Sequence, residues 1–236
     1  MNILAIESSA VSAGAAILSD GKIISESYLN VGLTHSQTLM RLVDSCLKNA
    51  GVTLDKMDIF AVSSGPGSFT GIRIGISVVK GLCFSSEKPV FGVSTLEAMA
   101  WGAAVEDAVI CPVMDARCMQ VYNALFEYNN GALVRLCPDR ALKLPELYED
   151  AQKYGKRIMF IGDGSSITAK YFCSQNGVDF SVFPEIFKYQ RASGVAFAAY
   201  MRYNSGENGV NAKTLLPSYL RLPQAERERL KRSENK

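Results

Sequence analysis

Strands and helices are expected in the same order in the two halves of this 236-residue chain, and this repetition restricts the possible folds more than any other feature. The first half opens with three short apolar runs, the last two joined by a hairpin turn at Asp20-Gly21. Helix and strand patterns then alternate to about residue 104, and the same order starts again at residue 109. Only the order βββαβαβα repeats, not the residue identities. The chain is therefore predicted to be an α/β protein made of two similar units.

The limits of the expected elements follow from apolar spacing and from turn residues. The stretch 35–50, for example, has apolar residues at helical spacing and is followed by Gly51, a frequent residue after a helix end. In the first half we expect strands at 3–6, 14–18, 23–29, 59–64 and 89–93, and helices at 35–50, 69–84 and 95–104. In the second half we expect strands at 109–114, 121–128, 133–142, 157–162 and 180–183, and helices at 145–154, 166–175 and 193–203.

Two units of this order suggest a duplicated ribonuclease-H-like domain with a cleft between the halves. This is the architecture of the actin, sugar kinase and Hsp70 superfamily. The expected subdomains are residues 1–105 and 106–215. Residues 216–236 contain few apolar side chains, so we expect this tail to cross the surface, anchored by Tyr219 and Leu220, and to end in a flexible segment.

The chain has a single histidine, His35, which excludes metal sites that need two imidazole ligands. Six cysteines form no CxxC pair and fit no zinc spacing, so we expect no metal and a reducing, cytoplasmic environment.

A net charge of +2 offers little attraction for nucleic acid. The first ten residues lack the basic segment of a signal peptide, and no run of about 18 apolar residues occurs, so we expect no membrane segment.

The sharpest local motif is GPGSFTG at 65–71, between an expected buried strand and an apolar helix. Its glycines permit close backbone approach, and Ser68 is suited to cap the helix. Free N–H groups at a helix start attract anions, which would make this a phosphate site. The spacing GxGxxxG, however, matches neither the dinucleotide fingerprint nor the P-loop. The motif therefore favours a tight strand-to-helix connection over a phosphate site.

Three further loops follow strands and are expected to face the cleft between the units. Turns are the simplest interpretation of each loop, but their equivalent positions suggest a nucleotide cleft inherited from the fold. His35 is expected at a helix start and not as a catalytic base, because no GxSxG nucleophile motif is present. The candidate cleft residues are Glu7, Ser8, Asp115, Arg117, Gly162, Asp163 and Gly164.

Two expected helices, 35–50 and the one after GPGSFTG, are more apolar than a helix that covers one sheet face requires. Apolar positions of the first span roughly 160°, and those of the second cover more than half of its circumference. Such helices must be buried on two sides. Either the second half of the chain covers them, or they form a helix bundle with another molecule, and the pattern alone does not choose between these two possibilities.

Several motifs together resemble the bacterial TsaB family, also called YeaZ and formerly labelled glycoprotease-like or peptidase M22. The resemblance extends from residue 1 to about residue 230, and GPGSFTGIRIG is its most specific element. Where the family usually begins with Asp followed by Thr or Ser, this chain has Glu7-Ser8, which counts against a phosphate site at this loop. The matching motifs are ILAIESS at 3–9, GPGSFTGIRIG at 65–75, GVSTLEAMA at 92–100, DARCMQVY at 115–122 and PSYLR at 217–221.

This resemblance implies a part in forming N6-threonylcarbamoyladenosine at position 37 of tRNA. In that pathway a synthase makes threonylcarbamoyl-AMP, and TsaD, a relative of TsaB, transfers the group with a metal held by two histidines. The resemblance implies a non-catalytic subunit that binds and activates TsaD, is joined by the ATPase TsaE, and meets tRNA only through the complex. With His35 alone, the chain cannot hold such a metal, so we expect no metalloprotease activity and no cofactor.

The family contact surface, which also forms homodimers without TsaD, consists of the first two helices, and this favours the interface interpretation of the apolar pattern. The residues expected there are Met40, Val43, Leu47, Arg73, Ile76 and Lys80.

Two alternative functions remain. The first is an ATP-dependent small-molecule kinase of the same fold, with carboxylates from Glu7, Asp115 and Asp163. The second is RNA binding by the tail AERERLKRSENK, whose excess of two positive charges would make few phosphate contacts.

Overall fold

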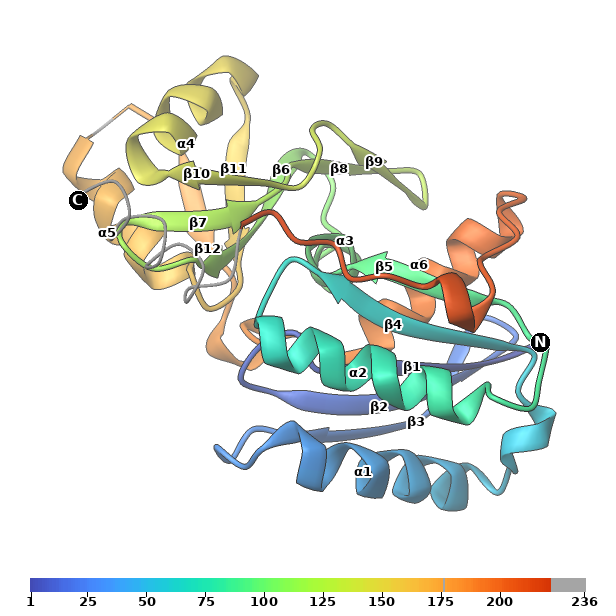
Figure 1. The fold of residues 1–236 in the computed structure, drawn as a ribbon. Coiled ribbons are helices and arrows are strands. Elements are labelled where there is room, and N and C mark those ends of the chain that lie inside the picture. The colour runs from blue at the N-terminus through green and yellow to red at the C-terminus, as the bar shows by residue number, and fades with distance from the viewer. Residues whose placement is uncertain (176, 222–236) are drawn as a thin grey trace.

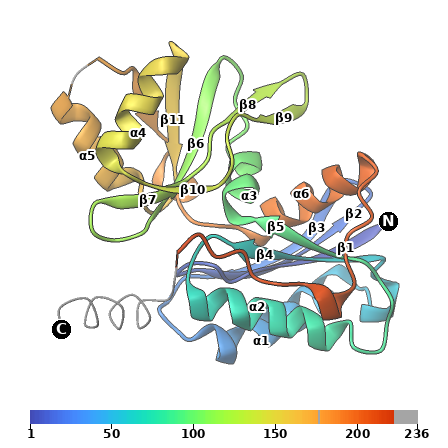
Figure 2. The same ribbon diagram turned by 45° about the horizontal axis from the view of Figure 1, so that its top comes forward.

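The computed structural model describes residues 1–175 and 177–221, which form two lobes around separate β-sheets (Figure 1). We call the five-stranded sheet with helices α1, α2, α3 and α6 the first lobe. The second sheet with helices α4 and α5 is the second lobe. Seen from a second direction, the lobes remain apart on one side and meet at α3 (Figure 2). Within the described ranges, no helix has both the length and the apolar character needed to cross a bilayer.

The first sheet has the strand order β3-β2-β1-β4-β5. β1 pairs antiparallel with β2 and parallel with β4, so the opening meander continues into a parallel sheet. The predicted order of three strands, helix, strand, helix, strand, helix is confirmed for this half. The strands are β1 (Asn2–Glu7), β2 (Ala13–Ser19), β3 (Lys22–Leu29), β4 (Ile59–Gly65) and β5 (Val90–Ser94).

Helices cover both faces of the first sheet, which explains why β1 is apolar at almost every position. Leu4 and Ile6 pack in the core beneath α1 and α2, whereas Ile3 and Ala5 belong to the core on the opposite face. α1 (His35–Ala50) and α2 (Phe69–Leu82) lie side by side on the outer face, and α3 (Thr95–Gly102) and α6 (Ala192–Asn204) lie on the inner face (Figure 1).

The second sheet has the order β10-β7-β6-β11-β12, and the hairpin β8–β9 pairs with the start of β6. α4 and α5 cover one face, and Leu96 and Met99 of α3 pack against the other. The strands are β6 (Ala108–Asp115), β7 (Gln120–Asn123), β8 (Phe126–Asn129), β9 (Ala132–Arg135), β10 (Arg140–Lys143), β11 (Arg157–Ile161) and β12 (Phe180–Val182). The helices are α4 (Leu144–Ala151) and α5 (Ser165–Gln175), with short 3-10 turns at Leu54–Lys56, Gln152–Tyr154, Glu185–Phe187 and Ala212–Thr214.

The prediction of single strands at 121–128 and 133–142 is wrong, because each is divided in two. β7 pairs with the end of β6 and β8 with its start in one common register, which places Pro112 opposite Ala124. Proline has no N–H to donate, so the ladder is interrupted there. Pro138 lies between β9 and β10. The sequence contains the prolines, but it does not show which strands pair beside them, so the interruptions were not predicted.

Helix α6 packs on β1 and β2 of the first sheet, although it follows the second sheet in the chain. Ala198 of α6 belongs to the core on this face of the sheet, and Gly194 allows α6 to pack closely against α3, since a Cβ on Gly194 would lie 2.3 Å from the carbonyl oxygen of Ala98. The predicted subdomain limits, 1–105 and 106–215, stay a prediction. After α6 the chain pairs Val210 with Val90 at the edge of β5 and runs toward the second lobe.

Candidate functional site

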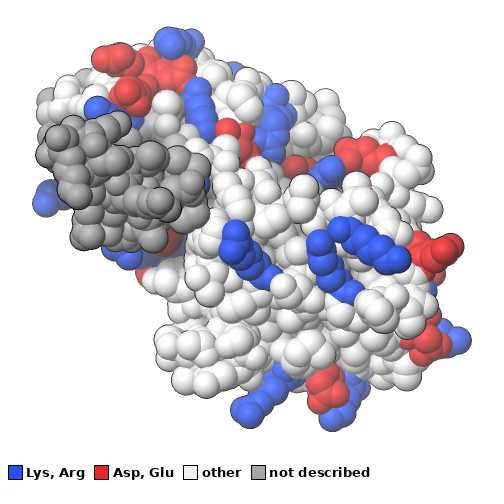
Figure 3. Space-filling model, in the orientation of Figure 1, with Lys and Arg blue, Asp and Glu red and all other residues white. Residues whose placement is uncertain are grey.

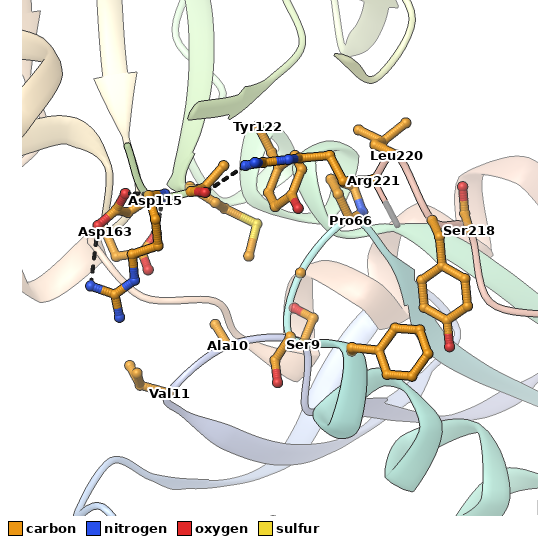
Figure 4. Close-up of a pocket in the computed structure, with 17 residues that line it drawn as sticks. Ser9, Ala10, Val11, Pro66, Asp115, Tyr122, Asp163, Ser218, Leu220 and Arg221 are labelled. Carbon is orange, nitrogen blue, oxygen red and sulfur yellow. Dashed lines mark hydrogen bonds and ion pairs between the residues drawn. The ribbon is translucent and has the colours of Figure 1, made fainter. Parts of the chain in front are cut away.

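A cleft of about 440 Å³ lies between the lobes, where the loop after β1 and the GPGSFTG loop face the loops after β6 and β11. Figure 4 shows Ser9, Ala10 and Val11 on one side, Asp115 and Asp163 on another, and Arg221 reaching across the gap. The cleft is lined by Ser9, Ala10, Val11, Pro66, Gly67, Ser68, Phe69, Met114, Asp115, Ala116, Arg117, Tyr122, Asp163, Ser218, Tyr219, Leu220 and Arg221.

Three of the seven predicted cleft residues, Asp115, Arg117 and Asp163, line this cleft. Glu7 and Ser8 are fully buried beneath it. Gly162 and Gly164 shape the turn behind Asp163, where a Cβ on Gly162 would lie 2.0 Å from the carbonyl oxygen of Val113. The strand-end loops therefore meet at one cleft, as expected, but not all of their residues face it.

Two carboxylates lie next to each other on the second-lobe side. Asp163 Oδ1 accepts a hydrogen bond from the Asp115 backbone N–H (3.3 Å), and Asp115 Oδ1 accepts one from the Arg117 N–H (2.7 Å). Burial raises the pKa of Asp163, and the nearby charge of Asp115 adds to this shift. Such a pair could bind a cation or accept a proton. Within the described ranges, no three His, Cys, Asp or Glu side chains are grouped to hold a metal ion.

The first-lobe side of the cleft is closely packed. The Ser9 N–H and hydroxyl both donate to Glu7 Oε1 at 2.6 Å, and the Ser9 carbonyl accepts from the Ser68 N–H. The Gly71 N–H donates to the Ser68 side chain at 3.2 Å, which confirms the predicted helix cap. Two N–H groups at the start of α2 are thus already occupied within the chain. This geometry is that of a tight strand-to-helix connection.

Gly71 and Gly67 permit this packing because the loop after β1 touches their Cα atoms. A Cβ on Gly71 would lie 2.1 Å from the carbonyl oxygen of Ser8, and one on Gly67 2.3 Å from that of Ser9. Gly67 also has a φ of 155°, which side chains other than glycine rarely adopt. The two glycines thus allow the GPGSFTG loop to pack directly against the loop after β1.

His35 is the first residue of α1, as predicted. Its Nε2 lies 2.7 Å from the Ala10 carbonyl oxygen, and since a carbonyl only accepts, the proton is on Nε2. Buried Nδ1 has no hydrogen-bond partner in the described ranges. His35 therefore connects the start of α1 to the loop at the cleft.

The Glu7 carboxyl group is fully buried, and this burial raises its pKa; hydrogen bonds from Ser9 oppose the shift. Its Oε2 has no partner in the described part of the chain. As pH rises above the ordinary value near 4.5, the folded chain keeps a proton that the unfolded chain has lost. The free energy of unfolding therefore decreases with rising pH until the folded carboxyl also ionises.

We predict that Glu7→Gln removes this pH dependence and raises stability at neutral and alkaline pH. The amide keeps an oxygen that accepts from Ser9 and carries no charge to bury. Chemical denaturation between pH 4 and pH 8 measures the slope, with exposed Glu106→Gln as the matched control. An unchanged slope in Glu7→Gln would show that Glu7 does not cause it.

The C-terminal segment is the part of this site that the sequence did not place. Tyr219 stacks on Phe69 with ring centroids 4.5 Å apart, and Arg221 donates to the Ala116 carbonyl oxygen at 2.6 Å. Tyr219 was expected only as a surface anchor. The motif PSYLR indicated that this segment matters, but no local pattern indicates that it closes one side of a cleft.

Of the six residues expected at an interface, some are exposed, some are half-buried and two lie in the core. Met40 is 49% exposed, whereas Val43 and Ile76 are only 2% and 5% exposed and belong to the core under α1 and α2. Leu47 is half-buried, and Arg73 is exposed. Lys80 is half-buried and donates to the Lys213 carbonyl oxygen at 3.3 Å. Helical spacing identified an apolar stripe but not which of its edges faces the sheet.

Comparison with known proteins relates most of the chain to proteins of tRNA threonylcarbamoyladenosine formation. The family model for tRNA N6-adenosine threonylcarbamoyltransferase (TsaD) matches residues 30–229. The tRNA threonylcarbamoyladenosine biosynthesis protein TsaB of Bacillus subtilis is 31% identical over 226 residues, 96% of each chain.

Two solved structures from Pseudomonas aeruginosa share the fold. One, described as similar to peptidase YEAZ, has a TM-score of 0.80 and 28% identity. The other, named YeaZ, has a TM-score of 0.74 and 26% identity, and each comparison covers 93% of this chain and 99% of the other. The predicted α/β fold of two ribonuclease-H-like units is confirmed.

Proposed function

The chain belongs to the TsaB family of tRNA threonylcarbamoyladenosine biosynthesis proteins, and from this premise we propose that it binds and activates a TsaD-type transferase. In this role it is a non-catalytic subunit in the formation of N6-threonylcarbamoyladenosine at position 37 of tRNA. A TsaE-type ATPase joins the pair, tRNA is contacted through the complex, and the chain alone forms a homodimer.

One observation carries this proposal: α1 and α2 form an outer layer that leaves apolar side chains partly exposed. Met40 and Leu47 on α1, with Ile74 and Val78 on α2, are exposed or half-buried. In Figure 3 the face over α2 is mostly uncharged, with a few Lys and Arg side chains in its middle, and charged side chains of both signs lie at its lower edge, over α1. Exposed apolar areas of this kind mark protein contact sites. We assign the contact surface to the exposed side of α1 and α2.

The non-catalytic role is supported by the first-lobe side of the cleft. A kinase of this fold would need the Glu7 carboxylate at its substrate, but this group is buried and bonded to Ser9. The opposing observation is the pair Asp115 and Asp163, which lines the cleft and could serve a nucleotide-dependent enzyme. The tail at 225–236, considered above for RNA binding, lies outside the described residues.

Reconstitution tests the proposed function directly. The chain is combined with a TsaD-type transferase, a TsaE-type ATPase, threonylcarbamoyl-AMP and unmodified tRNA. Modified adenosine is expected only when both the chain and the transferase are present. Size-exclusion chromatography is expected to show a complex of the two proteins. Full modification without the chain would overturn the proposal. Turnover of Mg-ATP by the chain alone with a small-molecule acceptor would overturn it in favour of the kinase alternative.

A further inference from the structure

A C-terminal strap, residues 213–221, lies along α2 from its last turn to its first. At one end the Lys213 carbonyl accepts from Lys80, and Leu215 is buried in the core beneath α2. Farther along, the Ser218 N–H donates to the Ser64 carbonyl at 2.7 Å. Tyr219 then lies beside the first turn of α2. A molecule that contacts the exposed side of this first turn therefore also meets the strap.

The strap and α2 together hold the guanidinium of Arg73 in one orientation. Arg73 Nε donates to the Tyr219 hydroxyl at 2.8 Å, and the guanidinium carbon lies 3.8 Å from the centre of the Phe69 ring. Arg73 is nevertheless exposed, and its terminal nitrogens remain as donors. Among residues 1–175 and 177–221, no carboxylate pairs with it. The chain thus presents a fixed, unpaired guanidinium at its surface.

The charges around Arg73 indicate the chemistry of what it meets. α2 contains no acidic residue, and its two charged residues are Arg73 and Lys80. Between them Ile74 and Val78 are half-buried, so the exposed side combines apolar and basic groups. A complementary surface is apolar and carries a carboxylate, since the planar guanidinium binds carboxylates through two parallel hydrogen bonds.

We propose that α2 and the strap form one docking surface, in which Arg73 receives a carboxylate of the TsaD-type transferase. Tyr219 and Phe69 position the guanidinium, which lowers the entropy lost on binding. Tyrosine and arginine, like tryptophan, are enriched among the residues that contribute most to interface affinity. This inference rests on the proposed function and adds to it the strap and the acidic group on the partner.

Affinity measurements with the full chain and the transferase test this surface. Arg73→Gln is expected to weaken binding roughly 10- to 50-fold and to make it less dependent on salt. Arg73→Lys is expected to weaken it about tenfold, because lysine keeps the charge but not the planar pair of donors. Tyr219→Phe keeps the ring and loses the hydroxyl, with an expected loss of a few-fold. Arg157→Gln, an exposed arginine on β11 of the second lobe, is the control and should bind normally.

The outcomes separate this inference from the proposed function. If the unaltered chain does not bind the transferase, the proposed function fails. If it binds and Arg73→Gln binds equally well with the same salt dependence, the docking surface proposed here is wrong while the function stands. Binding of Arg73→Lys with unchanged affinity would overturn the proposed pair of hydrogen bonds from the guanidinium to a carboxylate, because a positive charge alone would then be enough for binding. Thermal melting of each variant checks that the fold is kept.

Discussion

Replacing Met40 and Leu47 together by arginine is expected to weaken association with the TsaD-type transferase at least about 100-fold and to abolish tRNA modification by the complex. Both side chains lie on α1, one exposed and one half-buried. Placing an unpaired charge in the centre of an interface costs several kcal/mol, and about 2.8 kcal/mol corresponds to 100-fold. Titration calorimetry gives the affinity, and quantification of modified adenosine in the reconstituted reaction gives the activity.

The matched control adds the same two charges at exposed apolar positions of the second lobe. Val134 and Val182 are 48% and 41% exposed, on β9 and β12. The double change Val134→Arg with Val182→Arg is expected to leave binding and modification unaltered. If the α1 variant were folded and bound the transferase normally, the contact surface would not include α1. Val43 is unsuitable for this test, because at 2% exposure an arginine there would disrupt the core.

Gly71→Ala is expected to destabilise the chain by about 3 kcal/mol, which would lower the melting temperature by roughly 6 to 12 °C. The new Cβ would lie 2.1 Å from the carbonyl oxygen of Ser8 and 3.3 Å from His35 Cδ2. The first turn of α2 must then move away from the loop after β1. Because this turn carries the Phe69 ring and begins the proposed contact surface, binding of the transferase should weaken as well. Thermal unfolding followed by circular dichroism measures the first effect.

Gly81→Ala in the same helix is the matched control, because no atom lies within 4 Å of the added Cβ. Alanine is a better helix former than glycine, so this variant is expected to gain about 0.5 to 1 kcal/mol. The two glycine substitutions should thus have opposite signs. Equal melting temperatures for Gly71→Ala and the unaltered chain would show that α2 shifts at little cost and that close packing at the motif is not required.

Local sequence patterns were sufficient for the elements of the first half of the chain, from β1 to α3. The turn at Asp20-Gly21, the helix from His35 and the cap at Ser68 were all predicted, because each depends on residues near in sequence. The second lobe was predicted less well. Pro112 interrupts the ladder only because it lies opposite Ala124. The partner of a strand depends on the register of the sheet, which local spacing does not contain.

At the candidate cleft, too, some residues were predicted correctly from local patterns and others were not. Asp115 and Asp163 were found because Asp115 ends one strand and Asp163 follows another strand of the same sheet, and such strand ends meet at one edge. Glu7 also ends a strand, but its side chain turns inward, where the carboxyl group accepts hydrogen bonds from Ser9. Whether a side chain at a strand end points into a cleft or beneath it depends on the packing of the neighbouring loop, here at Gly67 and Gly71.

The sequence by itself determined the order of elements in the first half of the chain, the family, and the exclusion of metal sites that need two histidines. These depend on residue identity and short-range spacing, which a chain carries whether or not it is folded. Only the tertiary structure decided that α6 returns to the first sheet, that Val43 and Ile76 are core residues, and that Tyr219 and Arg221 reach the cleft. These features are contacts between residues far apart in the chain, formed when both sheet faces are buried at once, so no local pattern specifies them.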